Sequence, residues 1–202
     1  MKLIVITAPS FFIEEDQIIT AMFEEGLDVL HLRKPDSSLT YLDRLINLIP
    51  EKYHKKIVIH DHFILKSEYD LRGIHLSARN SEVPYDYHGH ISCSCHSLDE
   101  VKTNKDACSY VLMSPVFDSI SKEGYKAAFS QKELKEAHKS KLIDDKVVAL
   151  GGVDETRIQT VKDLGFGGVA VLGDLWGRFN PKTDTNFVEI IEHFKKLKQL
   201  VD

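Results

Sequence analysis

Short apolar runs alternate along the whole chain with longer amphipathic stretches. Runs rich in β-branched residues favour strands, whereas apolar residues three and four positions apart favour helices. Residues 3–7 (LIVIT) show the first pattern, and residues 15–25, with apolar side chains on one face, show the second. The pattern predicts eight strands, at residues 3–7, 28–32, 56–60, 73–76, 90–94, 110–113, 147–150 and 168–172.

An amphipathic or connecting segment follows each predicted strand, so each pair of neighbouring strands is expected to be parallel. Eight such units in 202 residues predict a (β/α)8 TIM barrel that forms one domain over residues 1–202. The fourth helix is expected to be degenerate, because only residues 77–89 separate strands four and five, with Pro84 among them. A doubly wound open sheet is the alternative, but residues 8–10 (APS) lack the glycine fingerprint that such a fold carries after its first strand.

Composition limits the classes of partner. The net charge of -5 and the pI of about 6.1 argue against nucleic acid, which requires a basic face. The apolar run at the N-terminus is too short for a signal sequence or a membrane span, and three cysteines suit a reducing compartment, so we expect a cytoplasmic protein without a membrane partner. Barrels of this size often form homodimers, and no surface pattern in the sequence decides the oligomeric state.

Glycines end the last two predicted strands. Gly151 and Gly152 end strand seven, and Leu172 and Gly173 end strand eight. The active site of a (β/α)8 barrel lies at the C-terminal ends of its strands, and the last two turns commonly bind phosphate through backbone N–H groups. We therefore expect Gly152, Leu172 and Gly173 to form a phosphate cup, although the same glycines would also suit tight turns alone.

The loop after strand six offers further phosphate ligands. Ser119 and Ser121 alternate with Ile120, and Lys122 follows them. Two hydroxyl groups and an ammonium group are suitable donors to phosphate oxygens, and the lysine supplies charge that a leaving diphosphate requires. Serine and lysine are also common in solvated loops. This loop therefore indicates a phosphate site only in combination with the glycine turns after strands seven and eight.

Histidines gather at the predicted strand ends, namely His31, His60, His75 and His96. A zinc-dependent barrel hydrolase would normally carry His-x-His on its first strand, which residues 7–9 (TAP) lack. Neighbouring strand residues face opposite ways, so not all four histidines can converge. We favour hydrogen-bonding histidines that line a polar mouth, and a metal-dependent hydrolase remains the remote alternative.

In this order, the motifs resemble the thiamin phosphate synthase/TenI family over nearly the whole chain. The resemblance rests on residues 31–35 (HLRKP), 60–61 (HD), 73–76 (GIHL), 94–100 (SCHSLDE), 114–122 (SPVFDSISK), 151–153 (GGV) and 168–171 (GVAV). It implies an enzyme that joins an aminopyrimidine diphosphate to a thiazole phosphate, giving thiamin phosphate and diphosphate.

The resemblance also implies roles for individual residues. Catalysis is assigned to Arg33, Lys122, Ser94 and His60, and Asp61 matches one of two magnesium-binding aspartates. The thiazole phosphate is assigned to Ser119, Ile120, Ser121, Gly152, Leu172 and Gly173. The pyrimidine diphosphate is assigned to His31, Arg33, Lys34, His60, Ser94, Lys122 and Arg79.

Five positions depart from the family pattern, among them Pro35, where the family carries a lysine. Arg79 stands where the second magnesium aspartate is expected, and an arginine cannot ligate magnesium. His31 and His60 replace the family's glutamine and asparagine, and Pro115 occupies the position of the catalytic histidine of TenI.

These departures leave three alternatives. Arg79 neutralises the diphosphate in place of the metal, or His60 or His31 transfers protons in a TenI-like tautomerase, or the protein binds thiazole or thiamin phosphate without turnover. The first of these alternatives corresponds to the synthase reaction, and we place it ahead of the other two.

Overall fold

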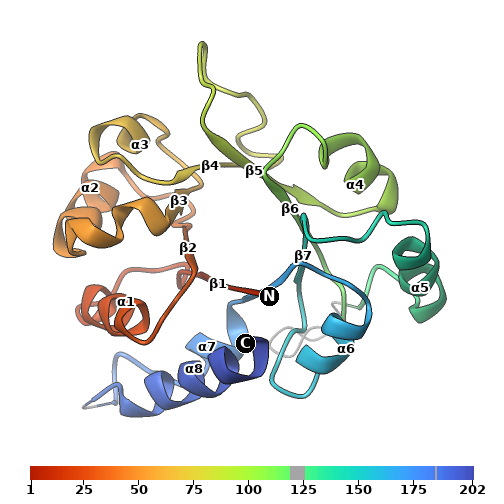
Figure 1. Ribbon diagram of the computed structural model, residues 1–202. Helices are drawn as coiled ribbons and strands as arrows, with labels where there is room; N and C mark the ends of the chain where they lie inside the picture. Colours follow the sequence, from red (N-terminus) through yellow and green to blue (C-terminus); the bar gives the residue numbers. More distant parts are fainter. Residues whose placement is uncertain (119–125, 185) are drawn as a thin grey trace.

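The computed structural model describes residues 1–118, 126–184 and 186–202. Eight parallel strands pair in chain order and close into a barrel, which confirms the predicted (β/α)8 class. Figure 1 shows the strands as a ring with the helices outside it. The strands are β1 (Lys2–Ile6), β2 (Val29–Leu32), β3 (Ile57–Ile59), β4 (Gly73–Leu76), β5 (His90–Cys95), β6 (Tyr110–Met113), β7 (Val147–Leu150) and β8 (Gly168–Val171).

The helices cover the outside of the barrel because their apolar faces pack on the outward side chains of the strands. They are α1 (Glu15–Glu24), α2 (Leu39–Leu48), α3 (Ile64–Glu68), α4 (Leu98–Asn104), α5 (Gln131–Lys139), α6 (Ile158–Asp163), α7 (Gly173–Trp176) and α8 (Val188–Val201), with a 3-10 helix at Glu51–Lys56. No helix in the described part of the chain is long and apolar enough to cross a membrane.

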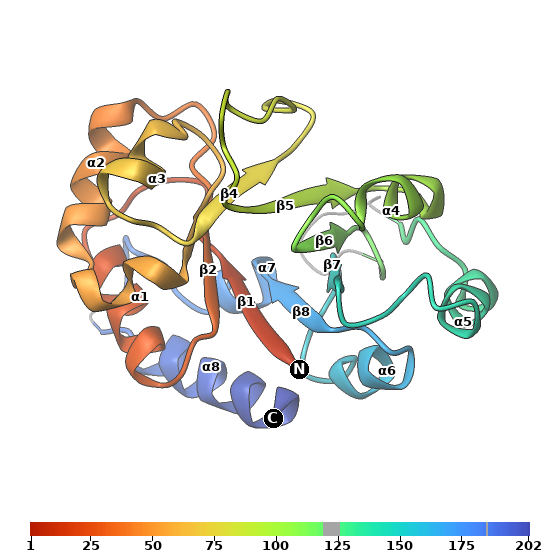
Figure 2. The same ribbon diagram turned by 45° about the horizontal axis from the view of Figure 1, so that its top comes forward.

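The segment between β4 and β5 contains no helix, as the sequence predicted. In Figures 1 and 2 this connection stands out from the barrel as a loop. A short antiparallel bridge between Ser77 and Asn80 turns the chain directly after β4. That turn brings residues 77–80 back over the C-terminal end of the barrel.

Side chains alternate between two cores along each strand. The larger core lies between strands and helices, and a smaller inner core includes Ile4, Val58, Tyr110 and Val148. Next to this inner core, β2, β4 and β5 contribute the buried polar residues His31, His75 and Ser92. One side of the barrel interior is therefore apolar, and the other is polar.

Candidate active site

A cavity of about 330 Å³ opens at the C-terminal ends of the strands, where the sequence placed the site. Apolar side chains from β1, β6 and β7 and from the residue that follows β8 form one wall, and polar side chains at the ends of β2 to β5 form the other. The lining residues are Ile6, Arg33, His60, Asp61, His75, Ser77, Ala78, Arg79, Ser94, His96, Leu112, Leu150 and Leu172.

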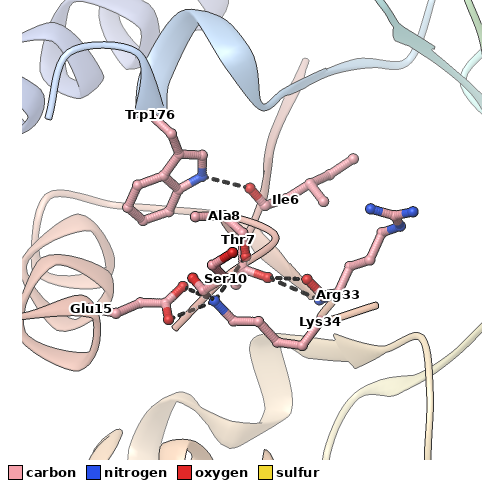
Figure 3. Close-up of polar contacts among 8 residues, drawn as sticks. All are labelled: Ile6, Thr7, Ala8, Ser10, Glu15, Arg33, Lys34 and Trp176. Carbon is pink, nitrogen blue, oxygen red and sulfur yellow. Dashed lines mark hydrogen bonds and ion pairs between the residues drawn. The ribbon is translucent and has the colours of Figure 1, made fainter. Parts of the chain in front are cut away.

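Arg33 and Lys34 are sequence neighbours with different environments. The backbone of Arg33 is held by Thr7, whose hydroxyl accepts from Arg33 N and donates to Arg33 O, both at 2.9 Å. The Arg33 side chain lines the cavity, whereas Figure 3 shows the Lys34 side chain directed away from it, toward Glu15. Successive residues after β2 point to opposite sides, and that alternation separates the two cations.

Lys34 is buried and fully engaged by protein groups. Its ammonium group lies 2.5 and 2.6 Å from the carboxylate oxygens of Glu15 and donates to the carbonyls of Ala8 and Ser10 at 2.8 and 2.9 Å. Burial raises the pKa of Glu15 to about 7, although the charge of Lys34 opposes the rise, and burial also lowers the pKa of Lys34. The structure therefore places Lys34 in a buried ion pair with α1, outside the cavity that its sequence position suggested.

Arg79 and Asp61 both line the cavity and carry opposite charges. Asp61 Oδ1 accepts a hydrogen bond from Asn80 Nδ2 at 2.7 Å, and Arg79 Nη2 lies 3.1 Å from Asp36 Oδ1 at the exposed rim. Magnesium binds carboxylate oxygens in octahedral geometry. Asp61 is the only carboxylate among the residues that line this described cavity, one of its oxygens is already bonded, and Arg33 and Arg79 are cationic. Asp61 alone supplies too few oxygens to hold a magnesium ion without further ligands, so its assignment as a magnesium ligand stays a prediction.

Gly151, Gly152 and Gly173, in the turns after β7 and β8, are half-buried and do not line the cavity. Leu172, which directly precedes Gly173, does line it. Gly151 and Gly152 have φ angles of 89° and 64°, a region that favours glycine. A Cβ on Gly152 would lie 2.3 Å from the carbonyl oxygen of Asp118, so a side chain does not fit there. Arg157, which the sequence analysis did not single out, donates to the carbonyls of Gly152 and Asp118 and fixes this turn.

The loop expected to bind phosphate falls partly outside the described residues. Ser119, Ile120, Ser121 and Lys122 all lie in the segment 119–125, so their assigned roles stay predictions.

Three histidines meet beneath the cavity. His31 Nδ1 lies 2.9 Å from His60 Nε2, and the rings of His60 and His75 stack with centroids 4.1 Å apart. Burial lowers the pKa of His75 to about 3, and burial also lowers the pKa values of His31 and His60 well below the ordinary range. All three imidazoles are therefore neutral at neutral pH. His60 and His75 reach the cavity, His31 lies behind them, and His96 lines another part of the cavity.

The three histidines bring one ring nitrogen each within 4.8 Å of one another, which is the composition of some zinc sites. Both ring nitrogens of His31 and both of His75 already hold hydrogen bonds to protein side chains. A metal ion would have to break these bonds. The geometry therefore favours hydrogen-bonding histidines, the interpretation preferred from the sequence, over metal ligands.

Sequence analysis missed two residues that hold these histidines. Tyr110 Oη lies 2.5 Å from His31 Nε2, and Ser92 Oγ lies 2.9 Å from His75 Nδ1. Both lie in the N-terminal halves of their strands, away from the strand ends where an active site is expected. Alternation along residues 90–94 (HISCS) was the available signal, because it places Ser92 on the same side as Ser94.

Comparison with known proteins gives consistent results. A family model described as thiamine monophosphate synthase matches residues 3–175. A thiamine-phosphate synthase of Methanobrevibacter smithii is 24% identical over 187 residues, which cover 88% of this chain and 87% of that protein. A crystal structure of thiamine phosphate pyrophosphorylase from Bacteroides thetaiotaomicron is 57% identical, covers 100% of this chain and 98% of the other, and superposes with a TM-score of 0.93. A thiamine phosphate pyrophosphorylase structure from Pyrococcus furiosus shares the fold, with 18% identity, coverage of 99% and 95%, and a TM-score of 0.76.

Proposed function

This chain belongs to the thiamine monophosphate synthase family, and we propose that it joins an aminopyrimidine diphosphate to a thiazole phosphate, releasing diphosphate. One observation carries this proposal: Arg33 and Arg79 line a cavity whose described lining contains a single carboxylate, Asp61. A cationic cavity with one apolar wall suits an aromatic ring that bears a diphosphate.

The side chains of this cavity divide the work by charge and polarity. Arg33 and Arg79 stabilise the negative charge that grows on the diphosphate as its bond to the pyrimidine methylene breaks. Leu112, Leu150 and Leu172 offer an apolar surface to the flat rings. The backbone at Gly152 and Gly173 holds the thiazole phosphate in this proposal, as loops after the last two strands do in many barrels.

The direct test combines the protein with both substrates and measures diphosphate and thiamin phosphate. Arg33→Met is expected to lower kcat/KM by about 10²–10³-fold, because it removes a charged donor from the site of charge development. Thermal unfolding should stay at the wild-type temperature, because this side chain faces the cavity. Release of diphosphate by neither protein would refute the synthase, and equal rates would refute the role of Arg33.

We propose that the guanidinium group of Arg79 neutralises part of the negative charge of the diphosphate. In the family pattern a magnesium ion, held in part by a second aspartate at this position, would do so. We therefore expect the wild-type protein to release diphosphate in the presence of EDTA. Arg79→Asp should lose most of this activity and regain part of it with added magnesium, because a second carboxylate then faces Asp61.

Arg44→Asp on the exposed face of α2 makes the same change of charge away from the cavity and should behave like the wild type. A wild-type protein that is inactive in EDTA and restored by magnesium would contradict the role given to Arg79.

A TenI-like tautomerase is the second candidate, favoured by one observation. His60 is neutral and lines the cavity, and within residues 1–118, 126–184 and 186–202 only its Nε2 holds a hydrogen bond, to His31. A neutral imidazole is suited to proton transfer near neutral pH. Isomerisation of a thiazole carboxylate phosphate without any diphosphate release in the two-substrate assay would select this candidate.

A further inference from the structure

The turn after β7 runs beside the segment that follows β6. Val116 N donates to Leu150 O at 2.9 Å, and Phe117 N donates to Gly151 O at 3.1 Å. Both bonds continue the parallel pairing of β6 and β7 toward the C-terminal end of the barrel. The carbonyl groups of Leu150 and Gly151 are therefore held by the segment after β6.

Arg157, the residue directly before α6, makes the next contact between these two segments. Its Nη1 donates to Gly152 O and, at 3.1 Å, to Asp118 O. The guanidinium carbon also lies 5.3 Å from the ring centroid of Phe117. One side chain thus joins the turn after β7 to the segment after β6.

Asp154 holds the backbone from which the Arg157 side chain extends. Asp154 Oδ1 accepts hydrogen bonds from Thr156 N and Arg157 N at 2.9 and 3.1 Å, and from the Thr156 hydroxyl group at 2.6 Å. Asp154 Oδ2 lies 3.9 Å from Arg157 Nε. Asp154 therefore orients Arg157 toward the turn, and neither side chain lines the cavity.

The carbonyl bonds decide where the N–H groups of this turn point. In a trans peptide the carbonyl group and the following N–H point in opposite directions, so the bonds of Gly151 O and Gly152 O direct the N–H groups of Gly152 and Val153 away from Phe117 and Arg157. Within residues 1–118, 126–184 and 186–202, neither N–H group donates to another residue. Val153 is buried, and the backbone N–H groups of buried residues are nearly always bonded. Successive N–H groups of this kind form a concave donor site for an anion.

We propose that Arg157 is a positioning residue for the phosphate group of the thiazole substrate, because it holds Gly152 O and thereby aims the N–H groups of Gly152 and Val153 at that phosphate. The proposal rests on the proposed function for its substrate and for the phosphate site at Gly152. The diphosphate is assigned there to Arg33 and Arg79, which follow β2 and β4. Arg157 therefore serves only one of the two substrates.

Arg157→Met removes both carbonyl bonds and keeps an unbranched side chain beside Phe117. We expect KM for the thiazole phosphate to rise about 10-fold, the range of one lost hydrogen bond from a charged group. KM for the pyrimidine diphosphate and kcat should stay within about twofold of the wild type, because only ground-state binding of one substrate is affected. Calorimetric titration with the thiazole phosphate alone, and again with inorganic diphosphate present, should show the same loss of affinity without turnover.

Arg44→Met makes the same replacement on the exposed face of α2 and should leave all three constants unchanged. An unchanged KM for the thiazole phosphate in Arg157→Met would overturn the role of Arg157. A parallel rise of both KM values would also overturn it, because a general disturbance of the barrel does not select one substrate.

Asp154→Ala separates positioning from a direct effect of charge. It removes a negative charge near the turn, so a guanidinium group that only attracted the phosphate would then bind it more tightly. A guanidinium group that holds the turn loses its orientation instead, and KM for the thiazole phosphate should rise. A KM that falls or stays constant in Asp154→Ala contradicts positioning. If Arg157→Met does not fold, Asp154→Ala is judged by the same criteria, because it leaves the guanidinium group in place.

The titrations also distinguish failure of this proposal from failure of the synthase. If the wild-type protein binds the thiazole phosphate but releases no diphosphate, the synthase is refuted, and the Kd values of the wild type and Arg157→Met still decide the role of Arg157. If the wild-type protein does not bind the thiazole phosphate, with or without inorganic diphosphate, the role of Arg157 is refuted as well.

Discussion

Lys34→Met is expected to lower the free energy of unfolding by about 3–5 kcal/mol, as measured by urea denaturation. The substitution leaves the carboxylate of Glu15 buried without its cation, and it removes the donor of two backbone carbonyls. Only 1% of the surface of either residue is exposed, so water cannot replace the lost partner. A carboxylate in that position must take up a proton or unfold its surroundings.

Two variants provide the control and the rescue. Arg33→Met makes the same replacement one residue earlier, at a side chain that faces the cavity, and should leave unfolding unchanged. Adding Glu15→Leu to Lys34→Met should recover most of the lost stability, because an apolar pair of similar volume often replaces a buried ion pair without cost. If Lys34→Met lowers the free energy of unfolding by less than about 1 kcal/mol, the buried pair contributes no more to stability than a surface salt bridge does.

Acidification below about pH 6 is expected to destabilise the fold steeply. The pKa values of His31, His60 and His75 are lowered by burial, so below the ordinary value of 6.5 the unfolded chain binds protons that the folded chain excludes. Stability is therefore fully present above pH 6.5 and decreases as the pH falls. Burial also lowers the pKa of His90 to about 4, which adds to this effect, whereas the raised pKa of Glu15, about 7, opposes it. The net slope is therefore that of about three protons and approaches about 4 kcal/mol per pH unit, which would unfold an ordinary domain by roughly pH 4–5.

Urea denaturation at a series of pH values measures this slope. His75→Gln should reduce it by about a third, because one of the three buried imidazoles is removed. A free energy of unfolding that stays constant between pH 7 and pH 5 would show that these histidines take up protons in the folded state.

Sequence reasoning located the barrel and its mouth because both depend on patterns along the chain. Arg33, Asp61, Arg79 and Ser94 follow or end four different strands, and closure of the sheet brings them around one cavity. The missing helix after β4 was also evident, because residues 77–89 are too short and too polar to cover a strand.

The contacts across the barrel could not be deduced in the same way. Tyr110 is the first residue of β6, and only the register that pairs it with Ser92 shows that it lies beside residues in the middle of β4 and β5. The ion pair of Lys34 with Glu15 follows from the alternation of side chains, which directs Lys34 to the side of the strand opposite to Arg33 even though the two are sequence neighbours. Strand register and side-chain alternation decide which polar residues meet, and the strand register depends on how the sheet closes.

The polar half of the barrel interior has an evolutionary consequence. Each polar side chain there is hydrogen-bonded to its neighbour. Replacing one of them therefore leaves the next without a hydrogen-bond partner in a region that water does not reach. These positions are therefore expected to change as a linked set rather than one at a time. His31 and His60, which both differ from the glutamine and asparagine of the family pattern and contact each other, are the pair for which such a linked change is expected.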